Sequence, residues 1–227
     1  MAEIDCEHGL ADEPWPRSAA EAKVVQESRR QRVIREDRFD QLERVVGLDA
    51  HYSAGGRVVW AAAALMTLPA LELEESTLVC CQTPFPYVPG FLSFRETPAM
   101  LAALRMLPTQ PDFLFVDGQG IAHPRRFGLA CHVGVLADIP TIGVAKSRLI
   151  GTYDDPGSER GARAVLKHRD EVIGAVIRTR RQTRPLFVSV GHRISLETAI
   201  KQVLTCSPRF RLPEPIRAAD RLSRAHD

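Results

Sequence analysis

The spacing of apolar and polar residues predicts a chain in which strands and helices alternate. Short apolar runs indicate strands over 44–52, 57–68, 76–83, 113–117, 140–145, 171–179 and 186–190. Apolar residues at helical spacing indicate helices over 18–42, 94–107, 126–137 and 195–205, and a last helix that begins near Pro215. The tight Ser-Ala-Gly-Gly connection of residues 53–56 is typical of a hairpin, so the first three strands are expected to pair antiparallel.

The order of these elements predicts the fold. Three antiparallel strands, a helix, a strand, a helix and a strand follow the order of the ribonuclease H-like fold. This is an α/β architecture in which antiparallel and parallel strands share a mixed central sheet flanked by helices. A chain of 227 residues supports one substantial core, so we expect a single domain over residues 1–227, with about residues 1–16 flexible.

Composition narrows the function only slightly. The 30 Lys and Arg residues against 28 Asp and Glu give a net charge of +2, which permits an anionic partner without requiring one. No apolar run is long enough to span a bilayer and residues 1–16 lack a signal-peptide core, so we expect a cytoplasmic protein without membrane contact, and a monomer. The five cysteines contain no Cys-x-x-Cys pair, which favours reduced, buried thiols over a zinc site or disulfides.

The strand over 113–117 leads directly into residues that carry chemistry. Asp117 ends it, at the sheet edge where open α/β sheets bind their ligands, and Gly118, Gln119 and Gly120 follow. Glycine lets a backbone approach a substrate closely, because it has no Cβ and tolerates positive φ. A strand that simply ends in a glycine turn is the structural alternative.

Asp49 lies in a second apolar run, residues 45–52, which is too apolar for a surface strand. A buried carboxylate has to be paired, hydrogen-bonded or metal-bound. If its strand lies beside the one that ends in Asp117, a strand spacing of about 4.8 Å brings both acids within reach of one Mg²⁺ or Mn²⁺ ion. A buried aspartate satisfied by backbone N–H groups is the alternative.

Three further charged residues have a structural interpretation beside a chemical one. Glu96 follows Ser93 at capping-box spacing, and it also completes a carboxylate cage if the helix starts across the two aspartates. Asp220, near the start of the last predicted helix, is on local grounds a partner for the helix dipole. Lys146 follows the strand over 140–145 and is either a cation for phosphate or water, or a solvated surface lysine.

Five segments carry a more specific signal: residues 86–96, PYVPGFLSFRE; 116–126, VDGQGIAHPRR; 140–148, PTIGVAKSR; 191–195, GHRIS; and 212–215, LPEP. Together, in order and spacing, they resemble the endonuclease V family of deaminated-base repair nucleases, from about Arg30 onward. The resemblance implies a Mg²⁺-dependent endonuclease, with Mn²⁺ as a substitute, that recognises deoxyinosine or other deaminated bases in DNA. It implies a nick at the second phosphodiester bond 3′ to the lesion, which leaves 3′-hydroxyl and 5′-phosphate ends.

The resemblance also assigns roles by position. It implies that the catalytic residues are Asp49, Glu96, Asp117, Lys146 and Asp220, with the four carboxylates as metal ligands. It implies that a wedge that enters the duplex is formed by Pro86, Tyr87, Val88 and Pro89, next to Gly90, and that the flipped base is held at Gly118, Gly120 and Ile121. Two prolines stiffen such a loop and leave Tyr87 free to stack on a base, although a Pro-rich loop is also a common connector.

One position departs from many relatives, which carry His where this chain has Gln119. Gln still offers a donor and an acceptor, but it does not change charge, so metal preference or rate is expected to differ. His123, Arg125, Arg126 and His192 are candidate phosphate contacts with structural roles as the alternative. Two other functions stay open: an endonuclease for inosine in RNA, and a structure-specific DNA-binding protein that does not cut.

Overall fold

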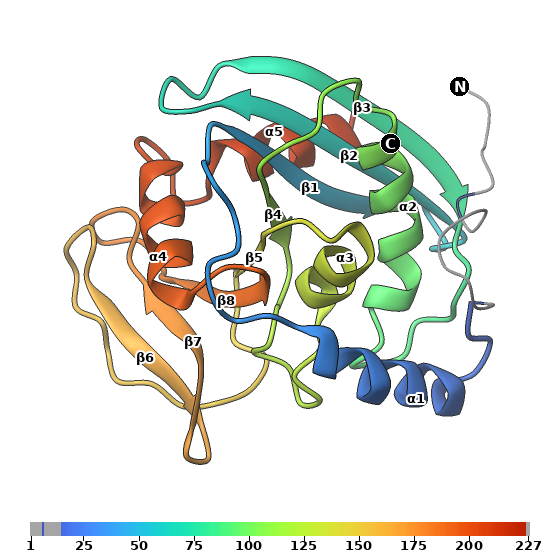
Figure 1. Ribbon diagram of the computed structural model, residues 1–227, viewed down its shortest axis with the longest axis horizontal. Coiled ribbons are helices and arrows are strands. Elements are labelled where there is room, and N and C mark those ends of the chain that lie inside the picture. The colour runs from blue at the N-terminus through green and yellow to red at the C-terminus, as the bar shows by residue number, and fades with distance from the viewer. Residues whose placement is uncertain (1–5, 7–14, 226–227) are drawn as a thin grey trace.

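Figure 1 shows a central sheet with helices on both faces, in a computed structural model that describes residue 6 and residues 15–225. The strands are β1 (Arg44–Tyr52), β2 (Val58–Thr67), β3 (Leu73–Gln82), β4 (Phe113–Asp117), β5 (Thr141–Ala145), β6 (Arg163–His168), β7 (Glu171–Ile177) and β8 (Leu186–His192). Their order in the sheet is β3-β2-β1-β4-β5-β8-β7-β6. β4 is parallel to both β1 and β5, and the other pairs are antiparallel. The predicted mixed sheet is confirmed.

The helices cover the sheet in two layers. They are α1 (Ala19–Arg29), followed by a 3₁₀ turn over Arg30–Arg32, α2 (Ser93–Arg105), α3 (Leu129–Ala137), α4 (Leu196–Thr205) and α5 (Glu214–Ser223). Alternate residues of β4 face the two layers, because successive side chains of a strand point to opposite sides. Leu114 and Val116 share a core with α2 and α3, whereas Phe113 and Phe115 share one with α4 and α5.

The last helix lies unusually close to the sheet. A Cβ built on Gly47 of β1 would be 2.1 Å from the carbonyl oxygen of Pro215, in the first turn of α5. Only glycine allows this approach, since no real Cβ tolerates such a contact. The close packing brings the later turns of α5, which include Asp220, over the end of β1.

The predicted helix over 18–42 is wrong in its second half. The helical segment ends at Arg32, and the chain beyond it runs extended along the segment that follows β8. There the Arg193 N–H donates to the Ile34 carbonyl at 2.8 Å, and the Arg38 N–H donates to the Arg193 carbonyl at 3.1 Å. Val33, Phe39 and Leu42 pack on the core from this extended segment, so tertiary contacts override the local helical pattern.

One strand was missed, and the expectation for the cysteines is wrong. The strand β6 was not predicted because it is an edge strand in which only Leu166 is buried. Cys6 and Cys81 form a disulfide, contrary to the expected reduced thiols, whereas Cys80, Cys131 and Cys206 are buried and are not part of it. Most of the segment expected to be flexible, residues 1–16, lies outside the described residues, but its described members Cys6 and Trp15 are buried against the core.

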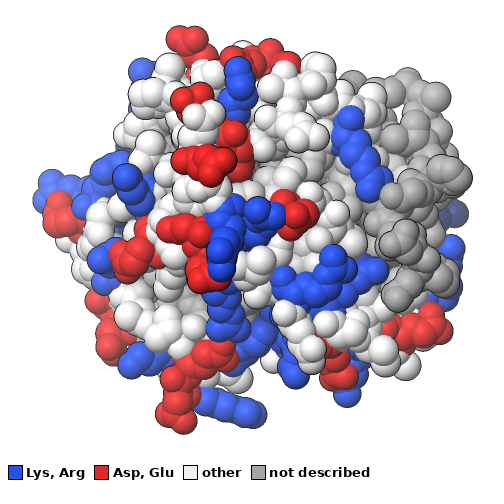
Figure 2. Space-filling model, viewed as in Figure 1, with Lys and Arg blue, Asp and Glu red and all other residues white. Residues whose placement is uncertain are grey.

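Charge and hydropathy give the surface no dominant character. Figure 2 shows Lys and Arg interspersed with Asp and Glu over the face in view, in keeping with the small net charge. Among the described residues, none of the helices has the length and apolar character needed to cross a membrane. Recognition of a charged partner therefore depends on local groups, and these gather at one edge of the sheet.

Candidate active site

Asp49 and Asp117 lie at the same edge of the sheet, as predicted. Leu48 of β1 is paired with Val116 of β4 in parallel register, so the two aspartates come next on adjacent strands. The charge of Asp117 contributes to the raised pKa of Asp49, as expected for two neighbouring carboxylates. Asp49 is 6% exposed and Asp117 is half-buried, so two carboxyl groups lie close together where water hydrates them poorly.

Burial and repulsion raise the pKa of the Asp49 carboxyl well above its ordinary value. Removal from water raises its pKa to about 7, and the charges of Asp117 and Asp220 act in the same direction. Two interactions lower this pKa: a hydrogen bond of 2.8 Å, which the buried hydroxyl of Ser223 donates to Asp49 Oδ2, and the charge of Lys146. Ser223 lies in α5 and is itself fully buried. The aspartate accepts this side-chain donor, so the alternative of backbone donors alone does not describe its surroundings.

Glu96 belongs to this acidic edge rather than to a capping box. The helix cap is Leu92, without a side-chain hydrogen bond, and the hydroxyl of Ser93 has no partner among the described residues. Glu96 Oε1 accepts a 3.0 Å hydrogen bond from the Tyr52 hydroxyl of β1. Burial raises the pKa of Glu96 to about 8, and repulsion from Asp49 and Asp117 adds to the shift. The capping-box alternative is therefore wrong.

Lys146 and Asp220 complete the edge. The Lys146 ammonium lies 2.5 Å from Asp117 Oδ2 and 4.0 Å from Asp220 Oδ1. Burial lowers the pKa of Lys146, but the bond to Asp117 and the surrounding carboxylates outweigh it and raise the pKa. Asp220 lies in the second half of α5, where it accepts from Arg224 Nε at 3.0 Å, so the predicted interaction with the start of the helix dipole is wrong.

The donor set of this edge suits a hard divalent cation. Carboxylate oxygens are the ligands that Mg²⁺ and Mn²⁺ prefer, and the mutual repulsion of these acids would be relieved by a positive ion. In the structure the Lys146 ammonium provides part of that compensation. Within the described residues, no three Asp, Glu, His or Cys side chains already stand close enough together to enclose a metal ion. The chemistry of the residues therefore fits a metal, although their present positions do not form a closed cage.

A pocket of about 420 Å³ opens beside the acids, and its lining joins several predicted segments. The wedge residues Tyr87, Val88, Pro89 and Gly90 form one side; Asp117, Gly118, Gln119 and Leu129 form another; and Lys146, Ser147, Arg148 and Leu149 border it. Its volume falls in the range of about 300–1,000 Å³ that is usual for ligand pockets. Tyr87 is 71% exposed at its rim, free to contact a ligand.

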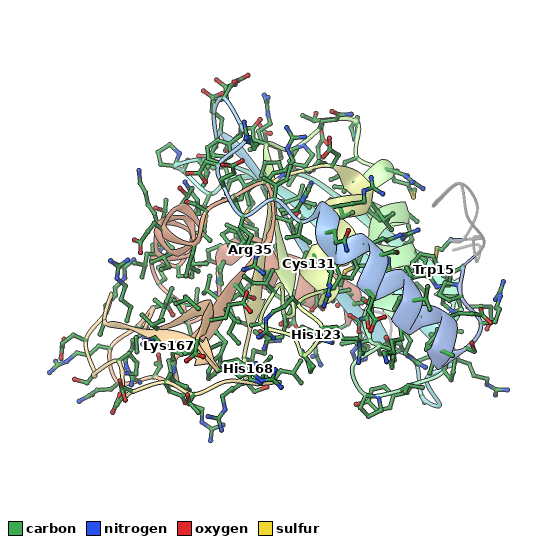
Figure 3. All side chains as sticks on the ribbon, turned by 60° about the horizontal axis from the view of Figure 1, so that its bottom comes forward. Trp15, Arg35, His123, Cys131, Lys167 and His168 are labelled. Carbon is green, nitrogen blue, oxygen red and sulfur yellow. A yellow bond between two sulfur atoms is a disulfide. The ribbon has the colours of Figure 1, made fainter. Side chains whose placement is uncertain are left out.

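The carbonyl of Gly90 anchors the wedge at its C-terminal end. It accepts from Arg125 Nη2 at 2.6 Å, from His123 Nε2 at 3.1 Å and from Gln26 Nε2 of α1 at 3.2 Å. His123 is buried, and burial with the nearby Arg125 lowers its pKa to about 4. Figure 3 looks onto this side of the molecule, with α1 and the loop that carries His123. His123 and Arg125 thus hold the wedge, which gives them the structural role that was the alternative, and their contact with phosphate stays a prediction.

The remaining predicted nucleic-acid contacts are also built into the protein. His192 is buried, accepts from the Ile34 N–H at 3.3 Å through Nδ1 and contacts Asp138 at 3.2 Å through Nε2. Arg126 Nε donates to Glu171 at 2.7 Å. A Cβ on Gly120 would lie 2.0 Å from the Val190 carbonyl oxygen, so this glycine serves close packing on β8. Ile121 is buried in the core.

Gln119 stands at the border of the pocket. Its Nε2 donates to the Ser147 carbonyl at 3.0 Å, which ties the β4 edge to the segment after β5. Its Oε1 is buried without a partner among the described residues. The side chain therefore fixes the loop that carries Lys146 and Ser147.

Three residues of the site are not among those that the sequence predicted. Ser223 and Tyr52 each donate to one of the buried acids, and Gln26 joins α1 to the wedge. Tyr52 lies at the end of the same strand as Asp49, so its position beside the acids could have been anticipated. Ser223 and Gln26 depend on contacts across 174 and 64 residues, respectively, which no local pattern reveals.

A ribonuclease H-like sheet that gathers buried acids and a lysine at one edge defines a nuclease, a hydrolase of phosphodiester bonds. Residues 27–221 match the endonuclease V family, and the chain belongs to that family. Endonuclease V of Trichormus variabilis is 51% identical over 211 residues, covering 92% of this chain and 96% of the relative.

Solved structures agree with this assignment. Endonuclease V from Streptomyces avermitilis is 44% identical, with a TM-score of 0.89 over 92% of this chain and 93% of that chain. A variant of Ciona intestinalis endonuclease V, in complex with a 23-mer DNA containing an inosine followed by a ribo-adenosine, is 30% identical. Its TM-score is 0.80 over 90% of this chain and 95% of that chain.

Proposed function

We propose that this protein is a metal-dependent DNA repair endonuclease that recognises deoxyinosine. It cleaves the second phosphodiester bond 3′ to the lesion and leaves 3′-hydroxyl and 5′-phosphate ends. The proposal is supported by two features that lie together at one edge of the sheet. A buried acidic group with a lysine suits phosphodiester hydrolysis, and a pocket beside it, bordered by an exposed aromatic wedge, suits a base turned out of its stack.

The acids supply the oxygen ligands that a divalent cation prefers, Mg²⁺ or in its place Mn²⁺. Asp49, Asp117 and Asp220 are the proposed ligands, and Glu96 is either a fourth or the group that orients water. A bound cation supplies Lewis-acid stabilisation of the charge that develops on the phosphate oxygens. In the reaction, water adds to phosphorus, the bond from phosphorus to O3′ breaks and O3′ gains a proton. Lys146 is positioned by Asp117 to donate hydrogen bonds to the phosphate oxygens.

The wedge and pocket explain how an altered base is selected. Pro86 and Pro89 restrict the backbone on each side of Tyr87 and Val88, and Gly90 is fixed by three donors, so the loop tip is presented rigidly. A rigid tip loses little entropy when it intrudes between bases. Flipping costs least at a weakened pair, so a deaminated base opposite its former partner is the one most easily exposed. Gly118 then offers backbone without a side chain beside the pocket.

The experiment that tests the proposal compares matched labelled duplexes with deoxyinosine, inosine in an RNA strand, or neither, each with and without Mg²⁺. The RNA arm is included because the Ciona complex holds an inosine followed by a ribonucleotide. We expect cleavage of the deoxyinosine duplex that requires Mg²⁺. Stronger cleavage of the inosine-containing RNA strand would identify an endoribonuclease in place of a DNA endonuclease. Binding to both substrates with cleavage of neither would identify a non-catalytic protein.

A further inference from the structure

A second depression lies beyond the acidic edge. Its volume is about 710 Å³ and it is lined by Arg148, Tyr153, Asp155, Pro156, Arg178, Pro185 and Phe187. None of these residues except Arg148 borders the pocket beside the wedge. Arg148 therefore stands between the two hollows, and the surface they form is continuous through it.

The sheet places this depression in line with the site of cleavage. From the acids, the strand order runs β1, β4, β5, β8 and β7, with Asp117 ending β4, Lys146 following β5 and Arg178 following β7. Arg211 Nη2 donates to the carbonyls of both Lys146 and Pro185, at 2.9 Å each. The same side chain therefore links the edge that carries the acids to the wall of the depression. Two strand spacings separate β4 from β8, roughly 10 Å, or about three stacked nucleotide steps.

The lining suits a stacked base. Tyr153 is 37% exposed, and its ring rests on Phe187 of β8 in a T-shaped contact with centroids 5.4 Å apart. Phe187 is 6% exposed and belongs to the core, so the exposed ring above it has a firm support. An exposed aromatic ring on a rigid floor is the platform on which single-stranded nucleic acids stack their bases.

The charges suit a phosphate on one side of that ring. The Arg148 guanidinium lies over the Tyr153 ring, 5.7 Å from its centre, and it makes no ion pair within the part of the chain that the structure describes. Arg178, by contrast, donates to the Gly157 and Thr183 carbonyls and lies 3.4 Å from Asp155, so it braces the wall. The available cation is therefore Arg148, on the side nearer to Lys146.

We propose that this depression binds one nucleotide of the cleaved strand on the 3′ side of the cut, with its base on Tyr153 and its phosphate at Arg148. The inference rests on the proposed function, which places the lesion base at the wedge and the scissile bond at the acids. The strand that continues away from the wedge, past Arg148, is then the 3′ portion. The depression extends the recognised substrate beyond the lesion and the cut.

The test measures affinity separately from cleavage. Fluorescently labelled single strands that contain one deoxyinosine are shortened stepwise from the 3′ end, or from the 5′ end in a matched series. Their binding is followed by fluorescence anisotropy in EDTA, so that no strand is cut. The proteins are the parent, Tyr153→Ala, Tyr153→Phe and Arg148→Gln. Arg163→Gln is the matched control, because this exposed arginine of β6 pairs with Glu197 of α4, outside the depression.

We expect the parent to lose affinity by about 5- to 150-fold when the nucleotide that reaches the depression is removed from the 3′ end. This is the span that corresponds to about 1–3 kcal/mol for one stacked base. Tyr153→Ala should bind the longest strand more weakly than the parent by this factor, and its affinity should not fall further when the same nucleotide is removed from the 3′ end. Tyr153→Phe should bind every strand as the parent does. Arg148→Gln should lower the slope of log affinity against log salt by about 0.7, the value for one phosphate of a single strand.

Several outcomes overturn the inference. If Tyr153→Ala and the parent lose affinity in parallel at every 3′ length, the ring does not stack a base. If the variant instead abolishes a step in the 5′ series, the depression serves the other side of the lesion. If the slope of log affinity against log salt is the same for Arg148→Gln and Arg163→Gln, Arg148 does not contact a phosphate. Cleavage by the parent in Mg²⁺ is measured in parallel, so a failure here with intact deoxyinosine cleavage leaves the proposed function standing.

Discussion

Replacing Glu96 with Gln should reverse the order of stability of parent and variant as pH rises in the absence of metal. The folded protein raises the pKa of Glu96 from 4.5 to about 8 because the carboxyl is buried and lies near Asp49 and Asp117. A raised pKa means that the folded state prefers the protonated acid. The contribution of the protonated Glu96 carboxyl to the free energy of unfolding is complete below pH 4.5 and is lost progressively as the pH rises through about 8.

The magnitude follows from the size of the shift. A change from 4.5 to about 8 corresponds to roughly 5 kcal/mol at most, at 1.36 kcal/mol for each pH unit. Gln keeps an oxygen that accepts from the Tyr52 hydroxyl, but its buried amide N–H groups have to be desolvated, and we assign this a cost of about 1–3 kcal/mol at every pH. The variant should therefore be less stable at pH 5 and more stable, by roughly 2–4 kcal/mol, at pH 8.5. For a domain of this size, about 1 kcal/mol moves Tm by about 2–4 °C.

Differential scanning calorimetry in EDTA at pH 5 and pH 8.5 measures this reversal. Glu197→Gln, at an exposed carboxylate, is the control and should leave the pH dependence of Tm as in the parent. Added Mg²⁺ should raise the Tm of the parent more than that of Glu96→Gln, while cleavage by the variant falls by orders of magnitude. If the difference in Tm between parent and Glu96→Gln is the same at both pH values, the pKa of Glu96 is not raised by burial and repulsion. If Glu96→Gln cleaves as fast as the parent, the role of Glu96 is structural.

Three further predictions concern neighbouring residues. Asp117→Asn should abolish cleavage while binding to deoxyinosine DNA stays measurable, because a lost metal ligand removes transition-state stabilisation more than base recognition; near-normal nicking in saturating Mg²⁺ would contradict it. Tyr87→Ala should weaken binding to a duplex more than to a single strand, by up to about 1–3 kcal/mol, and equal losses on both in a gel-shift titration would exclude a wedge. Ser223→Ala removes the hydrogen bond that lowers the pKa of Asp49, so the rise of the single-turnover rate with pH should move toward alkaline pH by about 1 unit; an unchanged profile would show that Ser223 does not act on Asp49.

The strands that carry the acids were predictable because local pattern and burial agree there. β1 and β4 begin and end where their apolar runs do, and a carboxylate inside such a run is costly unless it has a function. The same logic placed Lys146 at the sheet edge. It did not place Glu96, because the spacing from Ser93 to Glu96 satisfies a capping box that the helix does not use.

Other features depend on contacts that the sequence does not display. His123, Arg125 and His192 are polar residues in a loop or at a strand end, where solvent or a phosphate is an ordinary expectation. The fold instead turns two of them onto the Gly90 carbonyl and the third onto Ile34 and Asp138. The disulfide between Cys6 and Cys81 joins residues 75 positions apart, and no spacing rule predicts such a pair.

The proposed cleavage is tested most directly by mapping the cut at single-nucleotide resolution. A 5′-labelled duplex with one deoxyinosine is incubated with the purified protein and Mg²⁺, and the product is run beside a ladder of the same strand. We expect one product that ends in a 3′-hydroxyl one nucleotide beyond the deoxyinosine, absent without Mg²⁺ and absent with Asp117→Asn. Cutting at other positions, equal cutting of the undamaged duplex, or cutting that persists without a metal would contradict it.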